Sequence, residues 1–405
     1  MTASDDAGSG ALRIDLDEDH DRYHRQSLIS WWDQERLSAA TVLVVGAGAL
    51  GNELVKNLAL VGVGRVVVVD MDKIENSNLS RCVFFRAEDE GQMKAEVLAA
   101  RASDLNPEVE VIPVVGDVRT AIGLGHFDAC DVVLGGLDNR EARVHINQAC
   151  WKTETPLVDG AIEGLLGMMR VFVPPDSACY ECTMSARDHE LIAFRRTCAL
   201  LSREEMLSGK VPTTATTSSI IAGMQVQEAI KLLHRDRIDY EFAGKGVAYN
   251  GLTHDTYVVD YKRKDDCMAH DSYEIDEAAQ IGDDETFSEV LDAARLKMGN
   301  DTVLDLEAEL VVSASCADCD ATTELCAPLV SMDETAVPCP SCGGERSFEF
   351  THTFDGTPSA LAAMTVSDVI PPFDVLTARL GMERSFYRLG TGNPIAALAD
   401  PSPSR

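Results

Sequence analysis

The chain has 405 residues, of which 45% are hydrophobic and 6% aromatic, a composition that predicts a soluble protein of about two to three domains. Its formal net charge of -32 repels phosphates and argues against a nucleic-acid partner, although such acidity is also typical of proteins from salt-loving cells. No apolar run reaches the ~18 residues that span a bilayer, and residues 1–21 are polar and acidic, unlike a signal or transit peptide. We therefore expect a cytoplasmic protein without a membrane partner.

Short apolar segments alternate with helical patterns along the first two thirds of the chain. Thr41–Val45 and Arg65–Asp70 are expected to be buried strands because they are short, apolar and β-branched. The other expected elements are helices at 21–38, 52–62, 91–105 and 220–233, and strands at 109–115, at 129–134 and within 244–261. This alternation predicts an α/β fold with a doubly wound, mostly parallel, Rossmann-like sheet.

The composition also predicts where domains begin and end. The expected division is a disordered acidic tail at 1–20, the α/β domain at 21–275, a linker and helix at 276–299, a separate small zinc-binding C-terminal domain at 300–392, and a tail at 393–405.

A glycine-rich turn follows the first buried strand. Gly46, Gly48 and Gly51 stand between that strand and a helix, where glycines permit a tight turn and let backbone N–H groups approach phosphates. This pattern alone also fits an NAD(P)-dependent enzyme or a purely structural turn.

Charged and amide side chains crowd after the second strand. Asp70 ends that strand and suits ribose hydroxyls, while Asn78, Arg81 and Lys94 follow it. A dehydrogenase does not need this set, whereas an enzyme that neutralises a triphosphate does, because charge develops on the departing pyrophosphate. Asp138, in Leu-Asp-Asn, then suits a magnesium ion that bridges phosphate oxygens.

Five motifs together resemble the adenylyltransferase family of ubiquitin-activating enzymes and their relatives in molybdopterin and thiamine biosynthesis. They are RYHRQ (22–26), GAGALG (46–51), VDMDKIENSNLSR (69–81), GQMK (91–94) and LDN (137–139). The resemblance covers about residues 22–270. It implies that Asp70 binds ribose, that Asn78, Arg81 and Lys94 hold the phosphates of ATP, and that Asp138 holds Mg²⁺.

The resemblance also implies a homodimer. Arg25 would reach across the interface to the ATP of the partner subunit, whereas without the resemblance it reads as a charge on a surface helix. Cys82 follows Arg81 where the family usually has glutamine; we interpret this departure as a variation in packing.

A candidate nucleophile lies further along the chain. Arg195 and Arg196 precede Cys198, and nearby cations favour the reactive thiolate. The resemblance supports a catalytic role, because family members place their cysteine shortly after a segment like Cys179-Tyr-Glu-Cys182-Thr183. The usual Cys-Thr pair is Cys-Ala here, so a structural cysteine remains the alternative.

Six of the 12 cysteines occur in three Cys-x-x-Cys pairs, which in a cytoplasmic chain indicates metal ligands. Cys316 and Cys319, with Cys339 and Cys342, have the spacing of a zinc ribbon. A redox pair would not come doubled, and Cys326 between the two pairs is expected to be an apolar residue.

A first zinc site is expected within the α/β domain. Cys267-Met-Ala-His270 stands where related enzymes carry a second cysteine pair, so Cys179, Cys182, Cys267 and His270 are predicted to bind Zn²⁺. The alternative for His270 is a solvated histidine in an acidic stretch.

Three functions remain in view. The first is ATP-dependent adenylation of the C-terminal glycine of a ubiquitin-like protein, followed by thioester formation at Cys198 and transfer to a conjugating enzyme. The second stops at the adenylate and passes it to a sulfur donor, as in molybdopterin, thiamine or tRNA thiolation pathways, with a sulfur-carrier protein as partner. The third, a non-catalytic adaptor, would not need the complete set of charged residues. The additional C-terminal domain favours the first.

Overall fold

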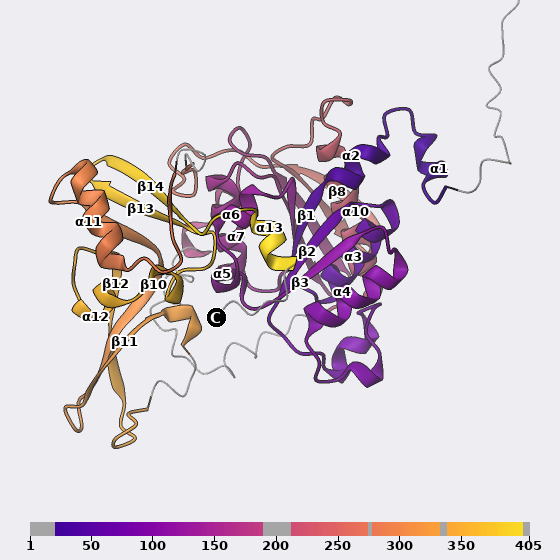
Figure 1. Ribbon diagram of the computed structural model, residues 1–405. Helices are drawn as coiled ribbons and strands as arrows, with labels where there is room; N and C mark the ends of the chain where they lie inside the picture. The colour runs from indigo at the N-terminus through magenta and orange to yellow at the C-terminus, as the bar shows by residue number, and fades with distance from the viewer. Residues whose placement is uncertain (1–20, 189–211, 274–277, 333–337, 400–405) are drawn as a thin grey trace, which may run out of the picture.

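The computed structural model describes residues 21–188, 212–273, 278–332 and 338–399, which form two units around two separate β-sheets (Figure 1). The strands of the N-terminal unit are β1 (Thr41–Val45), β2 (Arg65–Asp70), β3 (Glu110–Val115), β4 (Val132–Gly135), β5 (Leu157–Glu163), β6 (Leu166–Phe172), β7 (Lys245–Asn250) and β8 (Asp255–Asp260). Its main helices are α1 (His24–Ser27), α2 (Gln34–Ala39), α3 (Ala49–Val61), α4 (Lys94–Leu105), α5 (Val118–Ala121), α6 (Leu124–Asp128), α7 (Arg140–Lys152) and α10 (Ala215–Leu233).

The N-terminal sheet has the strand order β3-β2-β1-β4-β5-β6-β7-β8. Its first five strands pair in parallel, with Val44 of β1 opposite Val68 of β2 on one side and Leu134 of β4 on the other. The last three strands continue the sheet antiparallel. The structure thus confirms the predicted α/β class with a mostly parallel sheet.

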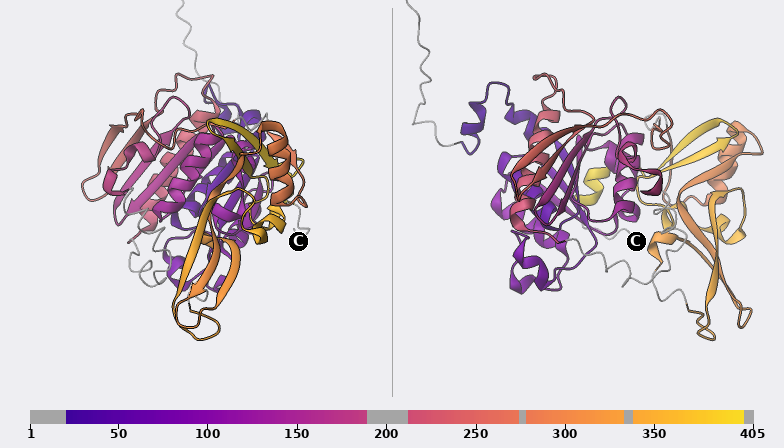
Figure 2. Two further views of the ribbon diagram at one scale, coloured as in Figure 1. Left: turned by 90° about the vertical axis from the view of Figure 1, so that its left-hand side faces the viewer. Right: turned by 180° about the vertical axis from the view of Figure 1, so that it is seen from behind.

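The five parallel strands are covered on both faces, as Figure 2 shows from two sides. Successive side chains of a strand point to opposite faces, so Val42 and Val44 pack with α3, α4 and α10 in one core. Leu43 and Val45 pack with the residues of α5, α6 and α7 in another. Burial on both faces explains why these strands are apolar without alternation.

Several element boundaries differ from the sequence expectation. The helix expected at 21–38 is two short helices, because the side chain of Asp33 caps a new start by accepting from the N–H of Arg36. The last long helix begins at Ala215 rather than 220, since Thr214 caps it through the N–H of Thr217. In both places a polar N-cap residue determines where the helix begins, and the spacing of apolar residues gives no information about that position.

The C-terminal unit has a six-stranded sheet of order β11-β10-β13-β14-β9, with β12 paired to β10. Its strands are β9 (Ala279–Ile281), β10 (Val303–Cys316), β11 (Thr322–Pro328), β12 (Arg346–Phe354), β13 (Val375–Leu380) and β14 (Glu383–Leu389). Helix α11 (Phe287–Met298) and the short α12 (Ser359–Ala363) pack on this sheet. The helix within the expected 276–299 linker therefore shares the core of the C-terminal unit.

The two units touch through a loop and a strand. The N–H of Gly125 donates to the carbonyl of Phe373 over 2.8 Å, and the N–H of Leu124 donates to Asp374 over 2.9 Å. Arg384 of β14 binds both carboxylate oxygens of Asp271 at 2.6 and 2.9 Å. Burial raises the pKa of Asp374 to about 6.

The segment expected as a tail at 393–405 contains a further helix, α13 (Pro394–Ala399). Its Ile395 is buried in the core that also holds Val118 and Phe127 of the N-terminal unit. In the part of the chain that the structure describes, no helix is long and apolar enough to cross a membrane.

Candidate nucleotide and metal sites

The glycine-rich turn lies at the carboxyl end of β1, where open α/β sheets bind ligands. Gly46 has a φ of +100°, and a Cβ there would lie 2.8 Å from the carbonyl oxygen of Gly136. A Cβ on Gly51 would lie 1.8 Å from the carbonyl oxygen of Gly46. A Cβ on Gly48, which caps α3, would meet no described atom within 4 Å. Gly46 and Gly51 are therefore needed for the packing of the turn, while Gly48 leaves the start of α3 open to an anion.

Asp70 braces this turn from the end of β2. Its carboxylate accepts from the N–H of Ala47 over 2.7 Å and from the N–H of Asp72 over 2.8 Å. Burial raises the pKa of Asp70, and the Lys94 ammonium and the two amide donors oppose that rise. Asp70 is thus held in place by one bond from the glycine-rich turn and one from the residue two positions further along the chain.

Lys94 starts α4 and lies against the same carboxylates. Its Nζ is 2.8 Å from a carboxylate oxygen of Asp72, and its side chain is only 11% exposed. Burial by itself would lower the pKa of Lys94, but Asp70 and Asp72 raise it above its usual value. Lys94 is therefore a firmly charged cation at the edge of the site. Asp72, its ion-pair partner, was not singled out from the sequence, although it stands within the VDMDKIENSNLSR motif.

Asn78 lies on a short helix, η2 (Asn76–Ser80), and Arg81 directly follows the end of that helix. Asn78 is buried and accepts from the N–H of Glu75 over 2.9 Å, and Arg81 donates to the carbonyl of Ser77 over 2.7 Å. Cys82 is buried in the hydrophobic core, where burial raises the pKa of its thiol to about 11. A neutral, buried thiol at this position agrees with a role in packing.

Asn52 links the glycine-rich turn to the segment that follows Arg81, and it was not singled out from the sequence. Its amide donates to the carbonyls of Ala47 and Gly48 over 2.8 and 3.1 Å, and its oxygen accepts from the N–H of Phe84 over 3.0 Å. The available signal was an asparagine directly after the glycine-rich turn. The structure shows that its amide is fully buried, and such a group needs partners.

The remaining ATP-site candidates lie on other elements. Asp138 is exposed in the loop between β4 and α7, directly before Asn139, which caps α7 by accepting from the N–H of Ala142. Arg25 is exposed on α1, which lies at the border of the N-terminal unit (Figure 1). Cys198, with Arg195 and Arg196, lies outside the described residues.

The first metal candidate brings together residues from two distant segments. The sulfur atom of Cys179 lies 3.7 Å from that of Cys182 and 3.6 Å from that of Cys267, and His270 Nε2 lies 3.3 Å from Cys182 Sγ. Tetrahedral zinc with Zn–S bonds of about 2.3 Å separates its sulfur ligands by about 3.8 Å. The N–H of Lys264 also donates to Cys182 Sγ. This donor set fits a zinc ion.

The second metal candidate lies where β10 ends and where β11 and β12 begin. Cys316 Sγ is 3.5 Å from Cys342 Sγ, and Cys319 Sγ is 3.7 Å from Cys339 Sγ. All four sulfur atoms lie within 4.8 Å of one another. Cys326 stays out of the cluster and is buried in the core of the C-terminal unit. The arrangement fits a second tetrahedral zinc ion.

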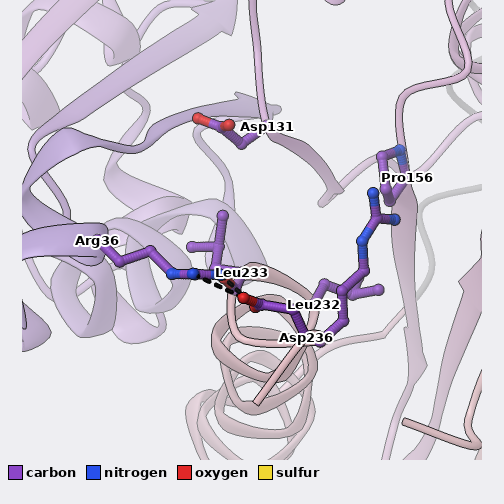
Figure 3. Close-up of a pocket in the computed structure, with 7 residues that line it drawn as sticks. Arg36, Asp131, Pro156, Leu232, Leu233 and Asp236 are labelled. Atoms are coloured by element: carbon purple, nitrogen blue, oxygen red, sulfur yellow. Dashed lines mark hydrogen bonds and ion pairs between the residues drawn. The ribbon is translucent and has the colours of Figure 1, made fainter. Parts of the chain in front are cut away.

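A surface pocket of about 270 Å³ lies elsewhere on the N-terminal unit (Figure 3). It is lined by Arg36, Asp131, Pro156, Leu232, Leu233, Arg235 and Asp236. Arg36 forms an ion pair with Asp236, and Asp131 accepts from the N–H of Thr41 at the amino end of β1. The pocket therefore lies at the amino ends of the strands, the edge opposite to the glycine-rich turn, and is not the nucleotide site.

Comparison with curated proteins gives relatives along the N-terminal unit. The SAMP-activating enzyme E1 of Haloferax volcanii is 34% identical over 258 residues, which are 61% of this chain and 87% of that protein. The sulfur carrier protein adenylyltransferase of Thermus thermophilus is 41% identical over 175 residues, 41% of this chain and 64% of that protein. Human ubiquitin-like modifier-activating enzyme 7 is 40% identical over 166 residues, 39% of this chain but only 16% of that protein.

A solved structure supports the fold. The crystal structure of E. coli MccB with ATP matches with a TM-score of 0.52 and 21% identity, covering 63% of this chain and 75% of MccB. The model of the ThiF family matches residues 21–269, more than half of the chain and nearly the whole N-terminal unit. The chain therefore belongs to the ThiF family, which confirms the resemblance inferred from its nucleotide-binding motifs.

Proposed function

We propose that the protein uses ATP to adenylate the C-terminal glycine of a small ubiquitin-like or sulfur-carrier protein. Family membership supports this function, as do the names of relatives that activate such carriers. The observation that carries it is the juxtaposition of Lys94, Asp70 and Asp72 at the open start of α3. An NAD-dependent enzyme, which leaves the ribose 2′-hydroxyl free of phosphate, has no need for an ammonium held at that place.

The proposed chemistry is attack of the carrier's terminal carboxylate on the α-phosphorus of ATP. The bond between that phosphorus and the bridging oxygen breaks, and pyrophosphate leaves with the negative charge. Asn78, Arg81 and Lys94 would hold the phosphates and neutralise this charge as it develops. Asp70 would bind the ribose, and Asp138 would bind Mg²⁺, which supplies further charge neutralisation when bound.

Carrier-dependent exchange of pyrophosphate into ATP tests this function. We expect exchange with a small protein that ends in Gly-Gly and no exchange when the terminal carboxylate is amidated, because the amide cannot attack phosphorus. Binding of such carriers without any exchange would identify the protein as an adaptor instead.

The step after adenylation has two candidates. Displacement of AMP by the Cys198 thiolate would form a thioester, whereas a sulfur-transfer enzyme would pass the adenylate to a sulfur donor. The C-terminal unit supports the first candidate, because it lies beyond the family match, which ends at residue 269, and would offer a conjugating enzyme a place to dock. This docking role is assigned by analogy, from the position of the unit after the adenylyltransferase domain.

We further propose that both cysteine clusters hold structural Zn²⁺, about two ions per chain. Closed sites with four protein ligands are structural rather than catalytic. Replacing Cys316 and Cys319 by serine should remove one of the two ions, as counted by elemental analysis. Cys326→Ser is the matched control and should leave the count unchanged. A wild-type protein with no zinc after metal-supplemented purification would contradict both assignments.

A homodimer with shared sites is part of the proposal. If Arg25 acts on the partner's ATP, Arg25→Ala and Asp138→Ala should each be inactive, yet a mixture should recover about a quarter of wild-type exchange. Only one of the two composite sites in a mixed dimer lacks both changes. No recovery after verified subunit exchange would exclude the trans role of Arg25.

A further inference from the structure

Three charged side chains are buried together beneath the loop that carries Asp138. The carboxylate of Asp159, on β5, is 1% exposed. It lies 3.1 Å from Nε of Arg143, on α7, and 2.6 Å from Nη2 of Arg170, on β6. The two guanidinium groups are 11% and 14% exposed. One anion thus faces two cations, which costs desolvation unless each group meets further partners.

The two arginines find different further partners. Arg143 Nη2 donates to the carbonyl oxygen of Leu137 over 2.5 Å and to that of Gly160 over 2.9 Å. The guanidinium of Arg170 instead lies over the ring of Tyr180, 4.9 Å from its centroid. Arg143 therefore connects the middle of β5 to the loop after β4, whereas the contacts of Arg170 with Asp159 and Tyr180 do not reach that loop.

The bond to Leu137 bears directly on Asp138. The carbonyl of Leu137 and the N–H of Asp138 belong to one planar peptide unit, so a donor that holds the carbonyl also orients the start of Asp138. Asn139 fixes the other side of the loop by capping α7. Asp138 itself is exposed, and both residues that flank it are held by hydrogen bonds.

We propose that Arg143 is a positioning residue that holds Asp138 in the direction required to bind Mg²⁺ with ATP. This inference rests on the proposed function of Asp138. Asp159 keeps Arg143 in place, and Arg170 shares the charge of Asp159, so that the network survives in a folded protein when either arginine is changed.

Arg143→Gln and Arg170→Gln form a matched pair for the test. Each removes one guanidinium from Asp159 and leaves the other, so neither creates an uncompensated buried carboxylate. Two quantities are measured in the full-length protein: deuterium exchange at the amides of residues 137–139, and the Mg²⁺ concentration that gives half-maximal ATP binding.

We expect Arg143→Gln to accelerate amide exchange in 137–139 and to raise the Mg²⁺ midpoint by roughly tenfold or more, because small misplacements of a ligand have large effects. For both quantities, Arg143→Lys should give values between those of wild type and Arg143→Gln, since a lysine ammonium replaces the charge but only some of the hydrogen-bond donors of the guanidinium. Arg170→Gln should change both quantities by less than about twofold, even if it lowers the melting temperature as much as Arg143→Gln.

Equal effects of the two glutamine variants, or no effect of Arg143→Gln on either quantity, would overturn the positioning role. If the wild-type protein binds no ATP at any Mg²⁺ concentration, the proposed function fails. The exchange of amides 137–139 then still decides whether Arg143 orders the loop.

Discussion

Replacing Lys94 by alanine is expected to abolish carrier-dependent pyrophosphate exchange. The ammonium is held at 2.8 Å from Asp72 with 11% exposure, so no other cation of that segment can take its place without rearrangement. Loss of one preorganised charge-assisted contact to the developing pyrophosphate costs roughly 10²-fold or more in rate. The measurement is exchange of labelled pyrophosphate at saturating carrier.

Lys73→Ala is the matched control for this result. Lys73 follows Asp72 directly and is exposed, so its loss changes the net charge equally and should leave exchange within about twofold. Arg81→Ala is expected to behave like Lys94→Ala. Exchange near the wild-type rate in both Lys94→Ala and Arg81→Ala would show that these cations do not serve the phosphates.

Replacing Cys198 by alanine is expected to remove a thioester entirely while pyrophosphate exchange continues. The adenylate is a mixed anhydride, and a thiolate displaces AMP from it. Arg195 and Arg196 precede Cys198 in the sequence, and opposing charge favours the thiolate. On a non-reducing gel with ATP, Mg²⁺ and carrier, wild type should show a band that dithiothreitol removes, and Cys198→Ala should show none.

Two outcomes separate the candidate reactions. A band that persists in Cys198→Ala would locate the thioester on another cysteine. A wild-type enzyme that adenylates its carrier but never shows the band would belong with the sulfur-transfer enzymes. Cys326→Ser serves as a control, because Cys326 is buried in the C-terminal unit and should leave the band intact.

Local sequence was sufficient where one physical requirement acts on consecutive residues. The strands Thr41–Val45 and Arg65–Asp70 have the predicted bounds, because a short run buried on both faces must be apolar throughout. The glycine-rich turn was equally readable, since only glycine fits at Gly46 and Gly51. The paired cysteines were visible for the same reason, as two-residue spacing directs both side chains to one point.

Helix starts were less readable. Thr214 and Asp33 begin helices by accepting from backbone N–H groups, and polar residues of this kind are common in loops as well. Helix α13 was expected to be part of a tail, because nothing in its six residues reveals that Ile395 finds an apolar surface on the N-terminal unit.

The sequence by itself determined the α/β class, the family, the glycine-rich turn and the cysteine pairs, since each depends on residues close together in the chain. The resemblance also predicted that His270 joins Cys182, and the structure brings the two together. Only the tertiary structure decided that Asn52 connects the turn to Phe84 and that Arg143 reaches Leu137 and Asp159. Those contacts join different elements, and their partners are set by strand order and helix packing rather than by any local pattern. A buried polar side chain requires a hydrogen-bond partner, but the tertiary structure determines which group that partner is.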